Sequence, residues 1–203
     1  SVAFATREAK VDPRRVYLVG VSGGGMAALL MAGRAPEIWA GVSAWVPISN
    51  LLSWFSESRE RGEVYEGDLL KVLGADPTRD SSAAREALAR SPITYLLAAK
   101  NLALDINAGI ADGHTGSVPI SHSLNAFNLL ADPKDRIPQA DIEFMVKSQS
   151  IPEGLRFDGE DPTYGEKKVL LRRESGKARV TLFQGGHEIL FPAALEWLEA
   201  QRK

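Results

Sequence analysis

Ser22 is the residue whose surroundings most clearly suit chemistry. It lies in the pentapeptide GVSGG (residues 20–24), directly after the apolar run 16–19. The glycines Gly20 and Gly24 are expected to let a strand and a helix approach closely around a strained serine. In such a turn the serine Oγ projects above the sheet, and the Gly23 N–H at the helix start faces a developing oxyanion. The pattern therefore predicts a nucleophile; the alternative is an ordinary strand-to-helix turn with an exposed serine.

A serine nucleophile needs a base, and the base needs an acid that orients it. After this kind of turn the expected chain order is serine, acid and histidine, each following a strand of the sheet. Asp112 follows the apolar run 102–110, and His187 follows the run 179–183. We therefore predict that Ser22, Asp112 and His187 form a catalytic triad, with the Gly23 N–H as one oxyanion donor.

Other histidines and carboxylates fit these roles less well by position: His114, His122, Asp105, Glu188, Asp158 and Asp161. His114 is two residues from the predicted acid, and His122 lies within the next expected helix, so solvated or capping roles are expected for both. Asp105 lies inside an expected strand and points into a layer. Glu188 is adjacent to the predicted base and cannot readily turn back to it, and the last two lie in a polar loop.

These residues need a scaffold, and the sequence predicts an α/β fold with a mainly parallel sheet flanked by helices. The expected strands are 16–19, 40–48, 102–110, 169–173 and 179–183. The last two form a hairpin with its turn at Ser175-Gly176. The expected helices are 3–10, 23–32, 120–130, 142–147 and 192–201.

Residues 50–95 are polar, charged and helix-forming, so we predict a helical insertion, or cap, within the domain. Three of its aromatic residues, Trp54, Phe55 and Tyr65, are candidates for lining a substrate pocket. The alternative for each is packing between the cap and the body. Trp39 and Trp45 are expected in the core or at the ends of the sheet.

Composition excludes several classes of function. The net charge of −2 does not suit a nucleic-acid partner, and no apolar stretch reaches the roughly 18 residues of a membrane helix. The chain has no cysteine, which excludes disulfides, thiolate zinc sites and a cysteine nucleophile. Its three histidines are scattered, so we expect no metal site and no cofactor. The expected partner is a small ester or peptide substrate.

The sequence resembles the C-terminal part of the catalytic domain of the prolyl-oligopeptidase family of α/β-hydrolases. The resemblance is carried by VDPRRVYLVGVSGGGMAALLMA, NAGIADGHTGSVPISHSL and FQGGHEIL, in the family's order and at similar intervals. It implies Ser22 as nucleophile, Asp112 as acid, His187 as base and the Gly23 N–H as oxyanion donor. One departure is that the family has a valine three residues after the acid, whereas Val118 is six residues after it.

The family's first strands, and the loop that supplies its second oxyanion donor, are not found in residues 1–203. The run 16–19 also resembles a central strand that lacks a neighbour on one side. We therefore expect a single catalytic domain completed by a missing N-terminal segment, in the same chain or a separate one. Because one oxyanion donor contributes about 100- to 1000-fold in rate, we expect residues 1–203 alone to be nearly inactive.

The function that these observations predict is a serine hydrolase that cleaves ester or peptide bonds through an acyl-enzyme. Esterases and peptidases share the triad, so the sequence leaves that choice open. Two alternatives also stay open: an acyltransferase that uses the same triad, and a non-catalytic binding module with this fold.

Overall fold

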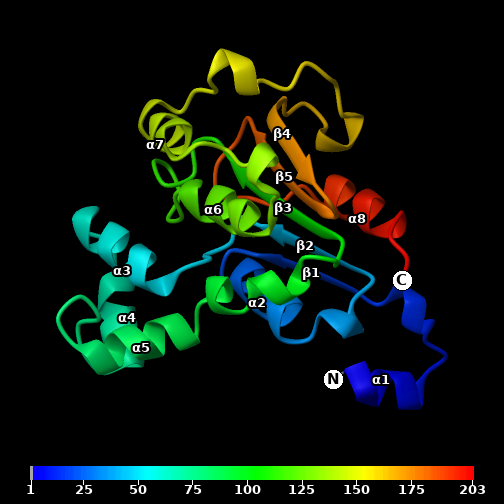
Figure 1. The fold of residues 1–203 in the computed structure, drawn as a ribbon, viewed down its shortest axis with the longest axis horizontal. Helices are drawn as coiled ribbons and strands as arrows, with labels where there is room; N and C mark the ends of the chain where they lie inside the picture. The colour runs from blue at the N-terminus through cyan, green and yellow to red at the C-terminus, as the bar shows by residue number, and fades with distance from the viewer. Residues whose placement is uncertain (1) are drawn as a thin grey trace.

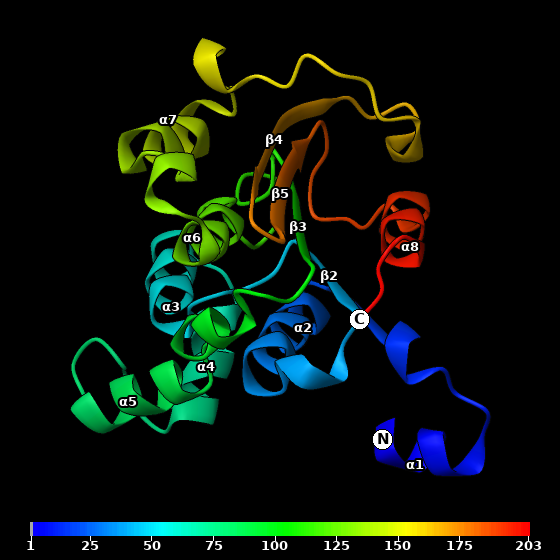
Figure 2. The ribbon, with the colours of Figure 1, turned by 45° about the vertical axis from the view of Figure 1, so that its right-hand side comes forward.

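A computed structural model describes residues 2–203. The protein has one sheet with helices on both faces (Figures 1 and 2). The sheet has the strand order β1-β2-β3-β5-β4. The strands are β1 (Tyr17–Val21), β2 (Gly41–Trp45), β3 (Leu104–Gly109), β4 (Val169–Ser175) and β5 (Ala178–Phe183). The first three strands and β5 pair in parallel, and β4 pairs antiparallel to β5. The predicted α/β fold, including the hairpin, is therefore confirmed.

Helices cover the two faces unequally. Helices α2 (Gly23–Arg34) and α6 (Ser121–Leu130) lie on one face, and α8 (Phe191–Glu199) lies on the other (Figure 2). Helix α7 (Gln139–Ser148) lies beside α6, while α1 (Val2–Glu8) has no buried residue. Among residues 2–203, no helix combines the length and apolarity that crossing a bilayer requires.

Three further helices form a group of their own beside the main body, which we call the helical unit (residues 51–89). They are α3 (Leu51–Glu60), α4 (Tyr65–Leu73) and α5 (Ser81–Ala89). Asn50 caps α3 and Asp80 caps α5 through side-chain oxygens that accept backbone N–H groups. The unit has its own apolar core, separate from the main core around the sheet. These helices lie within the predicted range 50–95.

A buried polar network braces the centre of the sheet. Asp105 in β3 has no exposed surface, and its carboxylate accepts hydrogen bonds from Ser43 (3.0 Å), Asn107 (2.7 Å) and Arg179 (2.8 Å). These partners lie on β2, β3 and β5, so one carboxylate links three strands. The Trp45 indole N–H extends the network by donating to Ser43 Oγ. Because all these groups are paired, the network tolerates its burial.

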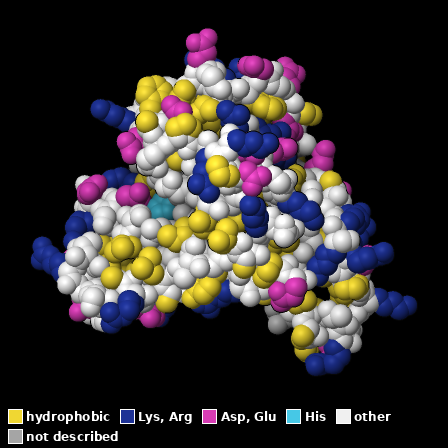
Figure 3. Space-filling model, in the orientation of Figure 1, with side chains coloured by type: hydrophobic (Ala, Val, Ile, Leu, Met, Phe, Trp, Pro, Cys, Tyr) yellow, Lys and Arg dark blue, Asp and Glu magenta, His cyan; other side chains and the backbone are white. Residues whose placement is uncertain are grey.

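Strand β1 forms one edge of the sheet. Among the described residues it pairs with β2 alone, and Val19 and Val21 are 40% and 37% exposed. Elsewhere the surface is mixed in character. Figure 3 shows Lys, Arg, Asp and Glu side chains interspersed over one face, with no large area of a single sign.

We predict that Asp105→Ala lowers the free energy of unfolding by about 3–5 kcal/mol, because it leaves the Arg179 charge unpaired at a largely buried position. Urea unfolding measures the change. The control is Asp68→Ala, which removes an exposed ion pair with Lys71 and should cost less than about 0.5 kcal/mol. Equal losses in the two variants would contradict this role for the network.

Candidate active site

Ser22 lies in the turn between β1 and α2, and its backbone is strained. Its φ of 56° and ψ of −122° are rare for a residue with a side chain. The Ser22 N–H donates to the Trp45 carbonyl at the end of β2 (2.9 Å), which ties the turn to the neighbouring strand. Val46, the next residue along, also has a positive φ of 43°. Two strained residues, Ser22 and Val46, therefore lie next to each other where β1 and β2 end.

Close packing of backbone at this turn explains some of its glycines. A Cβ on Gly20 would collide with the carbonyl of Gly24, and a Cβ on Gly25 would lie 2.7 Å from the Trp45 carbonyl oxygen. At Gly24 itself a Cβ would meet nothing within 4 Å. Gly20 must therefore lack a side chain, as expected, because the backbone of Gly24 lies against it. The same expectation for Gly24 is wrong, because the close contact with β2 is made one residue later, at Gly25.

The Ser22 hydroxyl is not used as a helix cap. Ser22 is the N-cap residue of α2, yet its side chain makes no capping hydrogen bond, unlike Asn50 and Asp80. The residue is half-buried, and the first N–H groups of α2, beginning at Gly23, lie beside it without intrahelical partners. The hydroxyl is therefore not engaged by the N–H groups of the helix that it precedes.

Asp112 and His187 lie in direct contact although they are 75 residues apart in the chain. His187 Nδ1 is 2.9 Å from Asp112 Oδ2 and 3.1 Å from Oδ1. Asp112 is 2% exposed, and its Oδ1 also accepts the N–H groups of Gly113 (3.0 Å) and Val118 (3.2 Å). These bonds fix the carboxylate. Although Val118 is six residues after Asp112, the loop between them folds back so that the Val118 N–H reaches the acid.

The charge on Asp112 acts on the imidazole. Its hydrogen bond raises the pKa of His187 above the ordinary value of 6.5, and the negative charge of Glu63 acts in the same direction. With Nδ1 held by Asp112, Nε2 is the nitrogen left to take a proton. Among residues 2–203, no hydrogen bond joins Nε2 to Ser22 Oγ. Such bonds are often long in unliganded sites and tighten when substrate binds.

All but one of the competing groups are engaged elsewhere. The Nδ1 atom of buried His122 faces the Ser49 N–H (3.1 Å), and its Nε2 is 2.8 Å from Glu57. His114 Nε2 is 2.6 Å from the Val146 carbonyl. Glu188 forms an ion pair with Lys167 (2.7 Å). Asp161 pairs with Arg172, Asp105 lies in the sheet network, and Asp158 is exposed.

The three aromatic candidates for a substrate pocket occupy different environments. Phe55 has no exposed surface and lies in the core of the helical unit, so it offers a substrate no contact surface. Trp54 and Tyr65 stack with ring centroids 5.0 Å apart, and Tyr65 is 38% exposed. The Trp54 indole N–H donates to the carbonyl of Ser117, on the loop that follows the predicted acid.

Gly116 is a residue that the sequence patterns did not identify. A Cβ at this position would lie 2.5 Å from His187 Cβ and would also collide with the Asp112 carboxylate. The loop therefore lies directly on the Asp112–His187 pair. No short motif marks this glycine, because one of the two residues that it contacts, His187, is 71 positions away in the chain.

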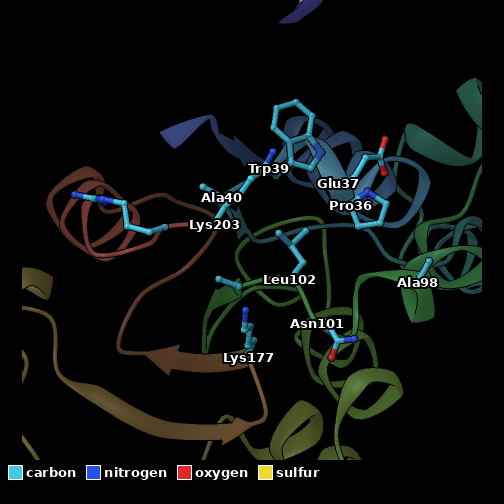
Figure 4. A pocket seen from close by; sticks show the side chains of 11 residues that line it. Pro36, Glu37, Trp39, Ala40, Ala98, Asn101, Leu102, Lys177 and Lys203 are labelled. Atoms are coloured by element: carbon cyan, nitrogen blue, oxygen red, sulfur yellow. The ribbon is translucent and has the colours of Figure 1, made fainter. Parts of the chain in front are cut away.

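One cavity lies at the opposite end of the strands, where they begin. It has a volume of about 320 Å³, and Ala40, Ala103 and Lys177, which line it, each precede a strand. Figure 4 shows its side chains, including Trp39, which is 9% exposed as expected for a core position. Ser22, Asp112 and His187 follow their strands, so this cavity is not part of their site.

Comparison with known proteins shows the family of this chain. A model of the prolyl oligopeptidase family matches residues 2–143. No curated protein matches the chain. Among solved structures, an acylaminoacyl peptidase of Pyrococcus horikoshii superposes with a TM-score of 0.51 and 17% identity, over 63% of this chain and 19% of the peptidase. A thermostable esterase superposes with a TM-score of 0.46 and 13% identity, over 100% of this chain and 35% of the esterase. The first likeness supports the fold, and this chain spans about a fifth of that peptidase.

We predict that His187 titrates above pH 6.5 and that Asp112→Asn lowers its pKa, because the carboxylate stabilises the imidazolium. The pair's contribution to the free energy of unfolding is then complete below pH 6.5 and is lost as pH rises through the folded-state pKa. An NMR titration of the imidazole measures both effects. Asp158→Asn, at an exposed position, is the control; a wild-type pKa at or below 6.5 would refute the assignment.

Proposed function

Because this chain belongs to the prolyl oligopeptidase family, we propose that its protein is a serine hydrolase acting on ester or peptide bonds. The observation that carries the proposal is the hydrogen-bonded Asp112–His187 pair at the same sheet edge as the strained Ser22 turn. Ser22 follows β1, Asp112 follows β3 and His187 follows β5. This is the order and the edge at which a serine triad operates in an α/β sheet.

In the proposed reaction Ser22 Oγ attacks the substrate carbonyl carbon while His187 Nε2 takes the hydroxyl proton. The carbonyl oxygen becomes an oxyanion, which the Gly23 N–H and the N-terminus of α2 stabilise. The bond to the leaving group then breaks as His187 returns the proton to it, and an acyl-enzyme remains on Ser22. Water, deprotonated by His187 Nε2, then attacks the acyl carbon. The bond to Ser22 Oγ breaks as His187 returns that proton to Oγ, and the carboxylic acid leaves. Asp112 holds the imidazole tautomer throughout.

The edge position of β1 supports a second part of the proposal. Val19 and Val21 leave apolar surface exposed beside the Ser22 turn, where a further strand would cover it. We propose that an N-terminal segment of the same domain, covalent or separate, pairs here and brings a second oxyanion donor. Removing one such donor lowers the rate by about 100- to 1000-fold, so activity depends on that segment.

We propose that the helical unit supplies residues that line the substrate pocket. Trp54 and the exposed Tyr65 stack on each other, and Trp54 reaches the loop beside the Asp112–His187 pair. They are the pocket-lining candidates that retain a supporting contact. An ester and a peptide would both be attacked at the same carbonyl, so parallel assays with both substrates decide between esterase and peptidase.

We predict that a fluorophosphonate probe labels the full-length protein and that Ser22→Ala abolishes the labelling and lowers kcat by roughly 10⁶-fold. Ser150→Ala, at an exposed serine, is the matched control and should label normally. Labelling that persists in Ser22→Ala would refute the nucleophile. A folded full-length protein that never labels would favour the non-catalytic binding module, and acyl transfer to an added acceptor would identify a transferase.

A further inference from the structure

We propose that Arg61 and Trp54 of the helical unit are positioning residues that hold the Asp112–His187 pair in its working geometry. They do so through the segment 113–118, which we call the acid loop. The inference rests on the proposed function of the pair. It gives the helical unit a role in the chemical step in addition to any contact with substrate.

Both side chains bind the same atom of the acid loop. The Ser117 carbonyl oxygen accepts a hydrogen bond from Arg61 Nη2 (2.8 Å) and another from the Trp54 indole Nε1 (2.9 Å). The peptide group that contains this carbonyl also contains the N–H of Val118. That N–H donates to Asp112 Oδ1 (3.2 Å). One rigid peptide plane therefore connects the helical unit to the acid.

The side chain of Val118 strengthens the connection. Val118 is 2% exposed and packs in the apolar core of the helical unit, with Phe55 among its members. The residue thus has its side chain in the unit and its N–H on the acid. On the other side of the loop, Gly116 lies against Asp112 and His187 so closely that a Cβ would not fit. Any shift of the loop must therefore move the pair or open a gap beside it.

The two anchoring side chains are themselves held in place. Arg61 Nε donates to Glu63 Oε1 (2.9 Å), and the two side chains are 26% and 22% exposed. The indole of Trp54 stacks on Tyr65. The second Glu63 oxygen is buried without a hydrogen-bond partner in the described part of the chain, and the Glu63 charge acts on His187. The anchors therefore contact the pair through the acid loop.

The expected consequence follows from the sensitivity of catalysis to geometry. A misplacement of about 1 Å costs on the order of 100-fold in rate. Loosening the acid loop should therefore lower kcat by about 10- to 100-fold with little change in KM. A role confined to substrate binding would instead raise KM. The two roles are distinguishable by this split.

The test uses the full-length protein with Trp54→Phe, Arg61→Lys and the double variant, which all preserve net charge and the aromatic stack. Arg59→Lys is the matched control, because Arg59 lies on α3 with Trp54 but pairs with Glu66 and Asp76 of the helical unit. The readouts are the NMR signal of the His187 Nδ1 proton, assigned by its loss in His187→Ala, the pKa of His187, and the rate of fluorophosphonate labelling. For Arg61→Lys, whose side chain is not a pocket-lining candidate, kcat and KM are measured as well.

We expect the double variant to weaken the Nδ1 proton signal, to lower the pKa of His187 and to slow labelling by 10- to 100-fold, with smaller changes in the single variants. Arg59→Lys should leave all three unchanged. A folded double variant with wild-type signal, pKa and labelling rate would overturn the inference. If instead the signal moves but the wild-type protein never labels, the proposed function fails and the positioning role stands.

Discussion

Four neighbouring strands, β1, β2, β3 and β5, pair in parallel, so their carboxyl ends all lie at one edge of the sheet. Residues from distant parts of the chain meet there because each follows one of these strands. The buried Asp105 carboxylate links β2, β3 and β5 below this edge. Strand β2 contributes no candidate side chain, but its last carbonyl holds the Ser22 N–H. The alignment of strand ends is therefore what creates the candidate site.

Where backbone segments approach closely at this edge, the positions are occupied by glycine. Gly20 and Gly25 allow β1, α2 and β2 to converge around Ser22, and Gly116 allows the acid loop to lie on Asp112 and His187. Gly109, at the end of β3, leaves room for the backbone of Gly185 in the segment that carries His187. Each of these close approaches connects two elements that both contribute to the site. The lack of a side chain at these four positions therefore allows the backbone around the candidate site to pack closely.

The helical unit adds a constraint from outside the sheet. It has its own apolar core, but Val118 of the acid loop belongs to that core, and Arg61 and Trp54 bind the preceding carbonyl. His122 makes a second attachment, because it faces the Ser49 N–H with one nitrogen and Glu57 of α3 with the other. The unit is therefore fastened to the body next to the proposed acid and base. A change in its position would be felt at the Asp112–His187 pair as well as in any substrate pocket.

The sequence by itself determined the features that depend on a few consecutive residues. The apolar runs predicted the strands and their parallel arrangement, Ser175-Gly176 predicted the hairpin, and the GVSGG pentapeptide predicted the strained turn at Ser22. Chain order also singled out Asp112 and His187 as candidates because each follows an expected strand, and the structure places the two in contact. The tertiary structure alone decided that Gly25 rather than Gly24 meets β2, that Phe55 is buried, and that Arg61 and Trp54 converge on the acid loop. These outcomes depend on how separately formed elements pack against one another. No periodicity or short motif encodes a contact between side chains and a backbone carbonyl about 60 residues away, so only the assembled fold specifies it.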